Sequence, residues 1–217
     1  MVFASSVAPP EMALLRRLPR LEHQAHFFYS EPAFQRAAVK VLPGEFFVTS
    51  EKVVLMTTLG SCVAACLHDR QAGVGGINHF MLPEGDGAEG ASGRFGVFAM
   101  ELLVNELLKR GARRENLEAK IFGGGQVMKS LASTQIGEKN VAFVETFLAR
   151  ERIPILARDV LDVYPRKICM FPESGKVLCK RLAAAGESEL QQQETRYRKQ
   201  LMVAPRAGAI ELFQELS

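Results

Sequence analysis

The residues of this sequence best suited to chemistry begin with a cysteine at a sharp corner. Cys62 ends the segment Thr57-Thr58-Leu59-Gly60-Ser61-Cys62, in which a strand pattern stops and Gly60 permits a tight turn. Such a corner projects the cysteine side chain and leaves nearby backbone N–H groups unpaired, and those donors are what an oxyanion hole requires. The alternative is that Cys62 is a small buried apolar residue, as most free cysteines are.

A histidine follows seventeen positions later, in the segment Gly75-Gly76-Ile77-Asn78-His79-Phe80-Met81-Leu82-Pro83. A histidine hydrogen-bonded to a thiol can take its proton and yield a thiolate, the nucleophilic form of cysteine. Taken alone, His79 is better explained as a structural histidine with apolar neighbours, as a single histidine usually is. Separately, Cys62 and His79 are each only weak indications of nucleophilic catalysis.

The other three cysteines have ordinary explanations. Cys66 lies four residues after Cys62, on the same face of a regular strand, and we expect it in the core. Cys169 and Cys179 lie on the two arms of an expected hairpin, where a four-residue loop would pair Phe171 with Lys176 and Cys169 with Leu178. The two thiols would then face opposite sides of the hairpin and could not form a disulfide.

The sequence predicts no metal or nucleotide site. It contains neither a CxxC pair nor an HExxH spacing, so a zinc site is not expected. The run Gly123-Gly124-Gly125 lacks the spacing of a phosphate-binding loop and is interpreted as tight packing near the catalytic corner. Gln126, directly after it, is a candidate substrate contact.

Two of these segments together resemble the CheD family of chemoreceptor glutamine deamidases. They are Leu59-Gly60-Ser61-Cys62-Val63 and Gly75 to Pro83, and the similarity continues through Leu117 to Gly125 and Ile136 to Asn140. It covers about residues 38–182. The resemblance implies a three-layer α/β/β sandwich and a Cys-His-Thr catalytic set, in which Cys62 and His79 match directly.

The threonine of that set has two candidates. Thr57 and Thr58 are adjacent on one expected strand, so their side chains point to opposite faces. We predict Thr57, because the pattern Thr-x-Leu-Gly-Ser-Cys is the one expected of the family. Thr58 is the alternative.

The resemblance implies a cysteine-dependent amidohydrolase that needs no metal or organic cofactor. The Cys62 thiolate would attack the carboxamide of a receptor glutamine with His79 as base and Thr57 orienting the imidazole. Backbone N–H groups around Gly60 and Ser61 would hold the oxyanion, and ammonia would leave. A methyl ester could reach the same thioester, which predicts a methylesterase side activity.

Three functional hypotheses follow. The first is deamidation of glutamines on the cytoplasmic helical domain of a chemoreceptor. The second is an adaptor that binds a CheC-type phosphatase of the chemotaxis pathway, as the family resemblance suggests. The third is a cysteine hydrolase acting on a different amide or ester.

The elements that must position these residues are mostly short strands. Helical spacing of apolar residues predicts helices over 95–110 and 138–150, while the polar, glycine-rich stretch 83–93 is predicted to be a loop. Strands outnumber helices and are not evenly interleaved with them, so the expected class is α+β with mixed sheets. The strand patterns cover 39–42, 45–49, 53–58, 63–67, 74–82, 117–122 and 153–163, followed by a hairpin of 167–171 and 177–182.

Size and composition fit one catalytic domain in the cytoplasm. The chain has 217 residues and a net charge of +3, too small an excess to indicate a nucleic-acid partner. Its longest apolar run, 62–67, is far short of the roughly 20 residues of a membrane span, and the first ten residues do not form a signal-peptide pattern. We expect an N-terminal extension over 1–37, the deamidase domain over 38–182 and a polar, weakly helical tail over 183–217, with neither extension tightly packed.

Overall fold

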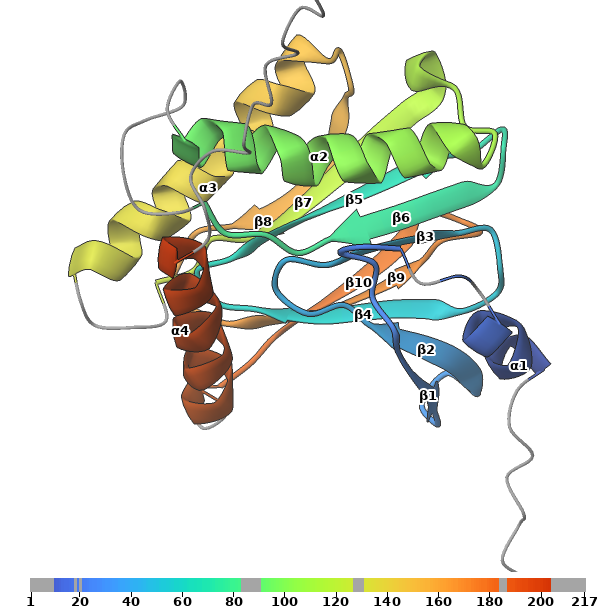
Figure 1. Cartoon of the computed structure of the whole chain (residues 1–217), viewed down its shortest axis with the longest axis horizontal. Coiled ribbons are helices and arrows are strands. Elements are labelled where there is room, and N and C mark those ends of the chain that lie inside the picture. Colours follow the sequence, from blue (N-terminus) through green and yellow to red (C-terminus); the bar gives the residue numbers. More distant parts are fainter. Residues whose placement is uncertain are drawn as a thin grey trace, which may run out of the picture.

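Two five-stranded sheets stack face to face, with helices covering the outer side of one of them (Figure 1). The computed structural model describes residues 10–17, 19, 21–82, 91–126, 131–183 and 187–203. The arrangement is the α+β fold with mixed sheets that the sequence predicted, in a single domain. In the part of the chain that is described, no helix is long and apolar enough to cross a membrane.

The first sheet, called sheet A, is antiparallel except at one edge. Its strand order is β3-β6-β5-β7-β8, and only the β7–β8 pair is parallel. The strands are β3 (Phe46–Thr49), β6 (Val74–Asn78), β5 (Val63–Asp69), β7 (Leu117–Gly123) and β8 (Ile155–Val160).

The second sheet, called sheet B, is also mixed, with one parallel pair between β2 and β4. Its order is β1-β2-β4-β9-β10, formed by β1 (Phe27–Glu31), β2 (Arg36–Lys40), β4 (Val54–Leu59), β9 (Arg166–Phe171) and β10 (Lys176–Arg181). The β9–β10 hairpin has the predicted register, Phe171 opposite Lys176 and Cys169 opposite Leu178. As predicted, these cysteines form no disulfide; Cys169 is buried and Cys179 is exposed.

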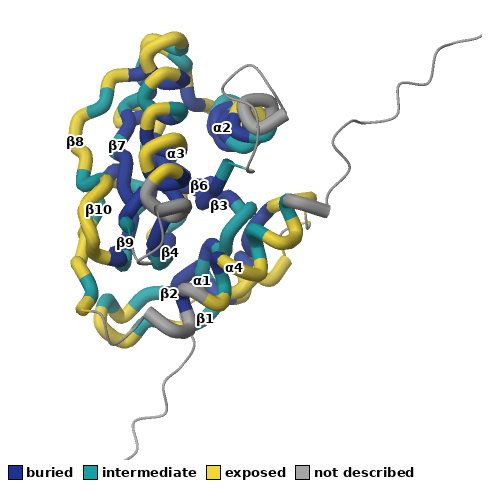
Figure 2. Tube along the Cα trace, turned by 90° about the vertical axis from the view of Figure 1, so that its left-hand side faces the viewer, coloured by how far each residue is buried: buried dark blue, intermediate teal, exposed yellow. Residues whose placement is uncertain are grey.

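Central strand β5 explains how the layers hold together. Alternate residues Val63, Ala65 and Leu67 face the helices, whereas Ala64 and Cys66 face sheet B, and all are buried. The strand therefore has no polar face, as expected for a strand covered on both sides. Figure 2 shows the buried residues gathered between the layers.

Helices α2 (Ala91–Lys109) and α3 (Leu131–Arg150) cover sheet A and supply its apolar contacts. A short 3-10 turn, Arg114–Asn116, precedes β7. Both helices begin several residues earlier than their apolar spacing indicated. Of the predicted loop 83–93, residues 83–90 lie outside the described residues and 91–93 belong to α2.

The two chain ends differ most from expectation. β1 pairs along its whole length with β2, and α1 (Pro10–Arg17) buries Met12 and Leu15 against the layer between the sheets. The expected start of the domain at residue 38 falls inside β2. At the other end, residues 187–203 form helix α4 (Glu187–Val203), which stands across one end of both sheets (Figure 1).

Candidate active site

The corner 60–62 carries the chain from β4 in sheet B to β5 in sheet A. The carbonyl oxygen of Gly60 accepts a hydrogen bond from the N–H of Gly125 at 2.6 Å, and that of Cys62 accepts one from the N–H of Gly124 at 2.7 Å. The carbonyl oxygen of Ser61 accepts a hydrogen bond from the side-chain amide of Asn140 at 2.8 Å. All three carbonyls are therefore held by the protein, which leaves the three N–H groups for another partner.

Those three N–H groups converge on one carboxylate. The backbone nitrogens of Gly60, Ser61 and Cys62 donate to the side chain of Glu194 on α4 at 2.9, 3.1 and 3.1 Å, and the Ser61 hydroxyl donates to it at 2.7 Å. Successive N–H groups aimed at one point form an anion-binding nest. The corner thus has the donors that the sequence predicted around Gly60 and Ser61, and they are occupied by an anion.

The glycine run is shaped by its contact with this corner. Gly123 has φ +108°, and a Cβ there would overlap the carbonyl oxygen of Cys62. Gly124 has φ +67°, and its Cβ would lie 2.6 Å from the Val141 side chain. The φ of Gly123 is one that residues with a side chain rarely adopt, and at both positions only glycine allows this close approach without a clash. The predicted tight packing of the glycine run near Cys62 is therefore confirmed.

Strand alternation decides which threonine faces the layer between the sheets. Leu55, Thr57 and Leu59 share one face of β4, and the two leucines belong to the core between the sheets that also contains Cys62. The Thr57 hydroxyl lies 2.8 Å from Nδ1 of His79 and is only 3% exposed. Thr58 faces the other way. The structure thus brings together Thr57 and His79, the pair predicted from the sequence.

The hydrogen bonds around Thr57 fix the tautomer of His79. The Thr57 hydroxyl donates its proton to the carbonyl of Val41 at 2.8 Å, so toward His79 it acts as an acceptor and Nδ1 carries the proton. Nε2 is buried and has no hydrogen-bond partner among the described residues. His79 therefore presents an unprotonated Nε2, the atom that would serve as a base.

Burial keeps both groups of the proposed nucleophile–base pair uncharged. Burial raises the pKa of the fully buried Cys62 thiol well above its usual 9, and the charge of Glu194 and a hydrogen bond to it raise that pKa further. Burial lowers the pKa of His79 to about 4, against the opposing charge of Glu194. With Glu194 in place, Cys62 is a thiol and His79 a neutral imidazole.

Comparison with known proteins gives the family. The family model for CheD chemotactic sensory transduction matches residues 81–181. A probable chemoreceptor glutamine deamidase CheD 1 of Albidiferax ferrireducens is 49% identical over 216 residues, covering 95% of this chain and 92% of its own. This chain belongs to the CheD family. A second relative, the probable chemoreceptor glutamine deamidase CheD 1 of Dechloromonas aromatica, is 50% identical over 194 residues, 88% of this chain and 96% of its own.

The CheD relationship extends further along the chain than the sequence motifs indicated. The motifs placed it at about 38–182, whereas the Albidiferax alignment covers 95% of the chain and so includes most of both terminal segments.

Among solved structures, the hypothetical protein YfiH of Bacillus licheniformis aligns with a TM-score of 0.35 and 14% identity, over 54% of this chain and 49% of its own.

Helix α4 is the part of the site that sequence reasoning missed. Its inward face carries Leu190, Glu194, Tyr197 and Leu201, and the first two are 5% and 2% exposed. The Tyr197 ring lies over Gly44, where a Cβ would come within 2.8 Å of it. A signal was present, since the spacing of 4, 3 and 4 residues is one helical stripe. The polar run 191–193 obscured it.

Asn140 is a second residue whose role the sequence did not reveal. It is fully buried, and besides holding the Ser61 carbonyl its Oδ1 accepts a hydrogen bond from the N–H of Leu82 at 2.8 Å. It therefore ties α3 both to the corner 60–62 and to the chain that follows His79. Its place in the family-like segment 136–140 was the only indication.

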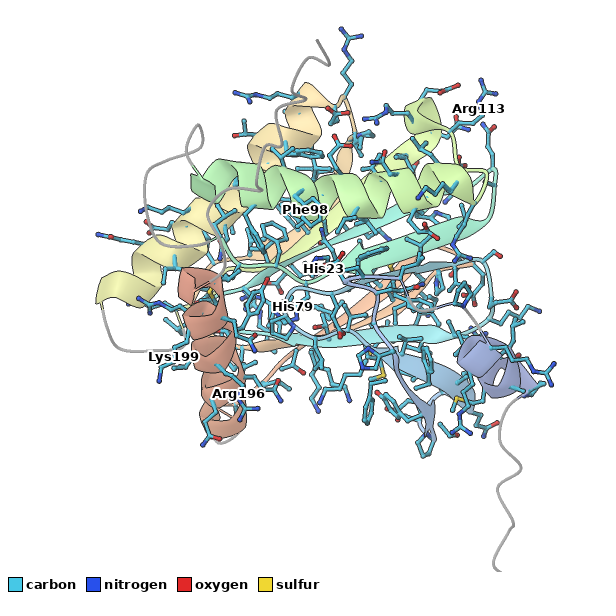
Figure 3. The ribbon with its side chains drawn as sticks, in the orientation of Figure 1. His23, His79, Phe98, Arg113, Arg196 and Lys199 are labelled. Carbon is cyan, nitrogen blue, oxygen red and sulfur yellow. The ribbon has the colours of Figure 1, made fainter. Side chains whose placement is uncertain are left out.

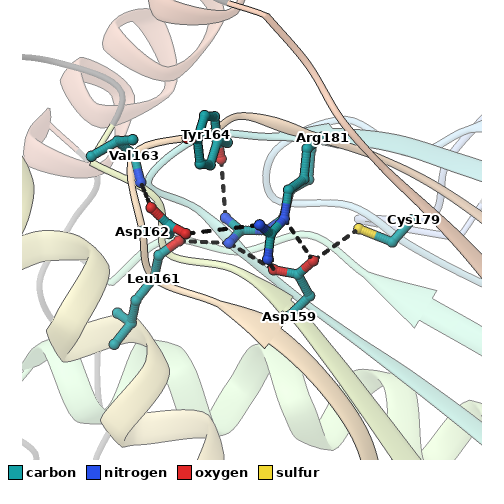
Figure 4. A network of polar contacts seen from close by, with 8 residues as sticks. Asp159, Leu161, Asp162, Val163, Tyr164, Cys179 and Arg181 are labelled. Carbon is teal, nitrogen blue, oxygen red and sulfur yellow. Dashed lines mark hydrogen bonds and ion pairs between the residues drawn. The ribbon is translucent and has the colours of Figure 1, made fainter.

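Gln126, the candidate substrate contact, is half-buried beside the corner, and its N–H donates to the carbonyl of Asp162. A polar network holds that neighbouring loop (Figure 4). The guanidinium of the fully buried Arg166 donates to Asp159 at 2.9 Å and to the carbonyls of Leu161 and Tyr164 at 2.7 and 3.0 Å. The network fixes the backbone next to Gln126, and within the described part of the chain no contact of the Gln126 side chain indicates a role.

Proposed function

We propose that this protein hydrolyses the carboxamide of glutamine side chains on chemoreceptors, yielding glutamate and ammonia, with Cys62 as nucleophile. Two named relatives, each about half identical to this chain, are probable chemoreceptor glutamine deamidases. The observation that carries the proposal is the N–H nest at Cys62, which already holds a carboxylate, the group that deamidation of glutamine produces.

The chemistry follows from the atoms at the corner. The Cys62 sulfur bonds to the carboxamide carbon while His79 Nε2 takes the thiol proton, and the N–H groups of residues 60–62 hold the oxyanion. As the C–N bond breaks, His79 returns the proton to the leaving nitrogen, which departs as ammonia. Water, deprotonated by His79, then cleaves the thioester, leaving glutamate and restoring the thiol.

Thr57 acts as a positioning residue in this scheme. Its hydroxyl accepts the Nδ1–H of His79, which keeps Nε2 directed toward the reaction and supports the imidazolium when it forms. A methyl ester of glutamate would give the same thioester with loss of methanol. A methylesterase side activity is therefore part of the proposal.

The test is mass spectrometry of a receptor cytoplasmic fragment incubated with the protein. Each deamidated glutamine gains on the order of 1 Da. Cys62→Ala should abolish the conversion, because it removes the thiol that forms the acyl intermediate, and the neighbouring Ser61 hydroxyl is engaged with Glu194. Cys66→Ala is the matched control, since Cys66 is buried on the same side of sheet A and should not be needed. Conversion by Cys62→Ala at the normal rate would refute the mechanism.

A further inference from the structure

Helix α4 lies on the catalytic corner with one face only. Its exposed side chains, including Gln192, Arg196 and Lys199, point away from the corner, as Figure 3 shows for the last two. The half-buried Tyr197 and Leu201 pack against the core between the sheets, Leu190 is buried, and the carboxylate of Glu194 lies in the nest. The surface that α4 covers thus accommodates an amphipathic helix that presents one polar side chain among apolar ones.

The chemistry of that polar side chain matches the proposed reaction. Glutamate is the product of glutamine deamidation, and the two side chains differ only by an oxygen in place of an NH₂ group. A carboxamide seated like Glu194 would direct its carbonyl oxygen to the N–H groups of Gly60 and Cys62, next to the thiol. This is the geometry in which an oxyanion would be stabilised. The NH₂ group of that carboxamide would take the place of the oxygen that accepts from Ser61, and the Ser61 hydroxyl would become the acceptor of that contact.

We propose that α4 occupies the surface on which the substrate helix binds, with Glu194 in the position of the target glutamine. The chain therefore inhibits itself until a substrate helix displaces α4. This inference rests on the proposed deamidase function and adds a substrate class to it. The substrate is an amphipathic helix whose glutamine has apolar side chains four residues before it and three and seven residues after it, in the pattern of Leu190, Tyr197 and Leu201.

Inhibition in cis follows from burial and from tethering. With α4 seated, Cys62 is 0% exposed and the nest is filled, so no substrate can reach either. A tethered helix competes at a high effective concentration, on the order of millimolar for a short linker. A substrate helix must therefore bind more strongly than α4 or be present at high local concentration.

The shielding of Cys62 is tested by alkylation of the intact protein with iodoacetamide, followed for each cysteine by peptide mass spectrometry. Glu194→Ala removes the charge-assisted hydrogen bonds, and Leu190→Asp places a charge at the buried anchor of α4. Each should speed alkylation of Cys62 at least about tenfold, because the thiol becomes accessible and its partner is lost. Gln192→Ala, on the exposed face, is the matched control, and the exposed Cys179 is the internal reference. Unchanged alkylation of Cys62 in both variants would overturn the inhibition.

The substrate position is tested by Glu194→Gln. If the seat of residue 194 is the seat of the target, the protein should deamidate its own introduced glutamine, gaining about 1 Da there, or retain the thioester to Cys62 and lose about 17 Da. Cys62→Ala combined with Glu194→Gln should show neither change, and the natural Gln192 on the exposed face should stay intact.

The outcomes separate the two proposals. If the introduced glutamine stays intact while the same variant deamidates a receptor fragment, α4 does not occupy the substrate position and the inference fails. If neither is deamidated, the proposed function fails, and the alkylation result still decides whether α4 shields Cys62. Deamidation of residue 194 without deamidation of the receptor fragment supports the proposal that residue 194 occupies the position of the target glutamine. It also shows that the receptor fragment was the wrong substrate.

Discussion

Replacing Thr57 by valine removes one hydroxyl and changes the shape of the buried layer very little. That hydroxyl makes two hydrogen bonds of 2.8 Å, donating to the carbonyl of Val41 and accepting from Nδ1 of His79. Both partners are buried with it, so the substitution leaves a carbonyl and an imidazole N–H without their present partner. The imidazole then also loses the contact that fixes its tautomer.

The expected magnitude follows from those two bonds. An unsatisfied buried polar group costs about 1–3 kcal/mol, so the two groups left by Thr57→Val should lower the free energy of unfolding by about 2–6 kcal/mol. For a chain of this size that corresponds to a fall in Tm of roughly 4–24 °C. If the same 1–3 kcal/mol is lost from stabilisation of the imidazolium, the deamidation rate falls about 5- to 150-fold.

The assay is ammonia release from a receptor fragment, measured beside thermal unfolding. It should be run in the natural chain and with Glu194→Ala, so that displacement of α4 does not limit the rate. Thr58→Val is the matched control, because Thr58 lies on the opposite face of β4 and should leave the rate within about twofold. If Thr57→Val keeps the natural rate, or if both variants lose rate equally, another group orients His79 and the tautomer argument is wrong.

Three further predictions concern the surroundings of the site. Because burial holds the pKa of His79 near 4, NMR titration of its imidazole should show it neutral at pH 5, and a midpoint near 6.5 would contradict this. The free energy of unfolding should also fall as the pH drops from 6.5 to 4, because in that range only the unfolded state gains the proton. Gly123→Ala should cost over about 2 kcal/mol in denaturant unfolding and more than Gly73→Ala, which shares the positive φ but has open space; equal costs would exclude the steric explanation. Arg166→Met should lower stability by about 2–4 kcal/mol, seen as a lower Tm, because it leaves the carbonyls of Leu161 and Tyr164 without their donor, whereas Asp159 keeps its ion pair with Arg181; a loss under 1 kcal/mol would be inconsistent with the network.

The sequence could predict local pairings because short-range rules decide them. The register of the β9–β10 hairpin follows from a four-residue loop, and the burial of Cys66 follows from its even spacing from Cys62. The choice between Thr57 and Thr58 was different. Alternation requires that they face opposite ways, but which face looks into the molecule depends on the sheet that packs against β4. Only the assembled layers settle that.

The terminal segments could not be read in the same way because their burial depends on long-range partners. β1 begins with the aromatic residues Phe27, Phe28 and Tyr29, but none of them is fully buried, and the strand is ordered by pairing with β2, which itself pairs with β4. Helix α4 is mostly polar, so composition predicts a solvated tail, whereas two well-buried side chains and a stripe of helical spacing fix its place. In each case a few residues decide the packing and the average composition conceals it.

The buried charge of Glu194 shows why such a helix is better explained by function than by stability. A carboxylate 2% exposed pays a large desolvation penalty, which its four donors at the corner must offset. An apolar residue at this position would leave those donors unsatisfied, so the corner selects a side chain with an acceptor oxygen. A nest built to stabilise an oxyanion attracts any carboxylate that the fold brings within reach. The same donors that would stabilise the oxyanion therefore also bind the carboxylate that blocks the site. The stronger these donors bind an anion, the more tightly they hold α4 on the corner.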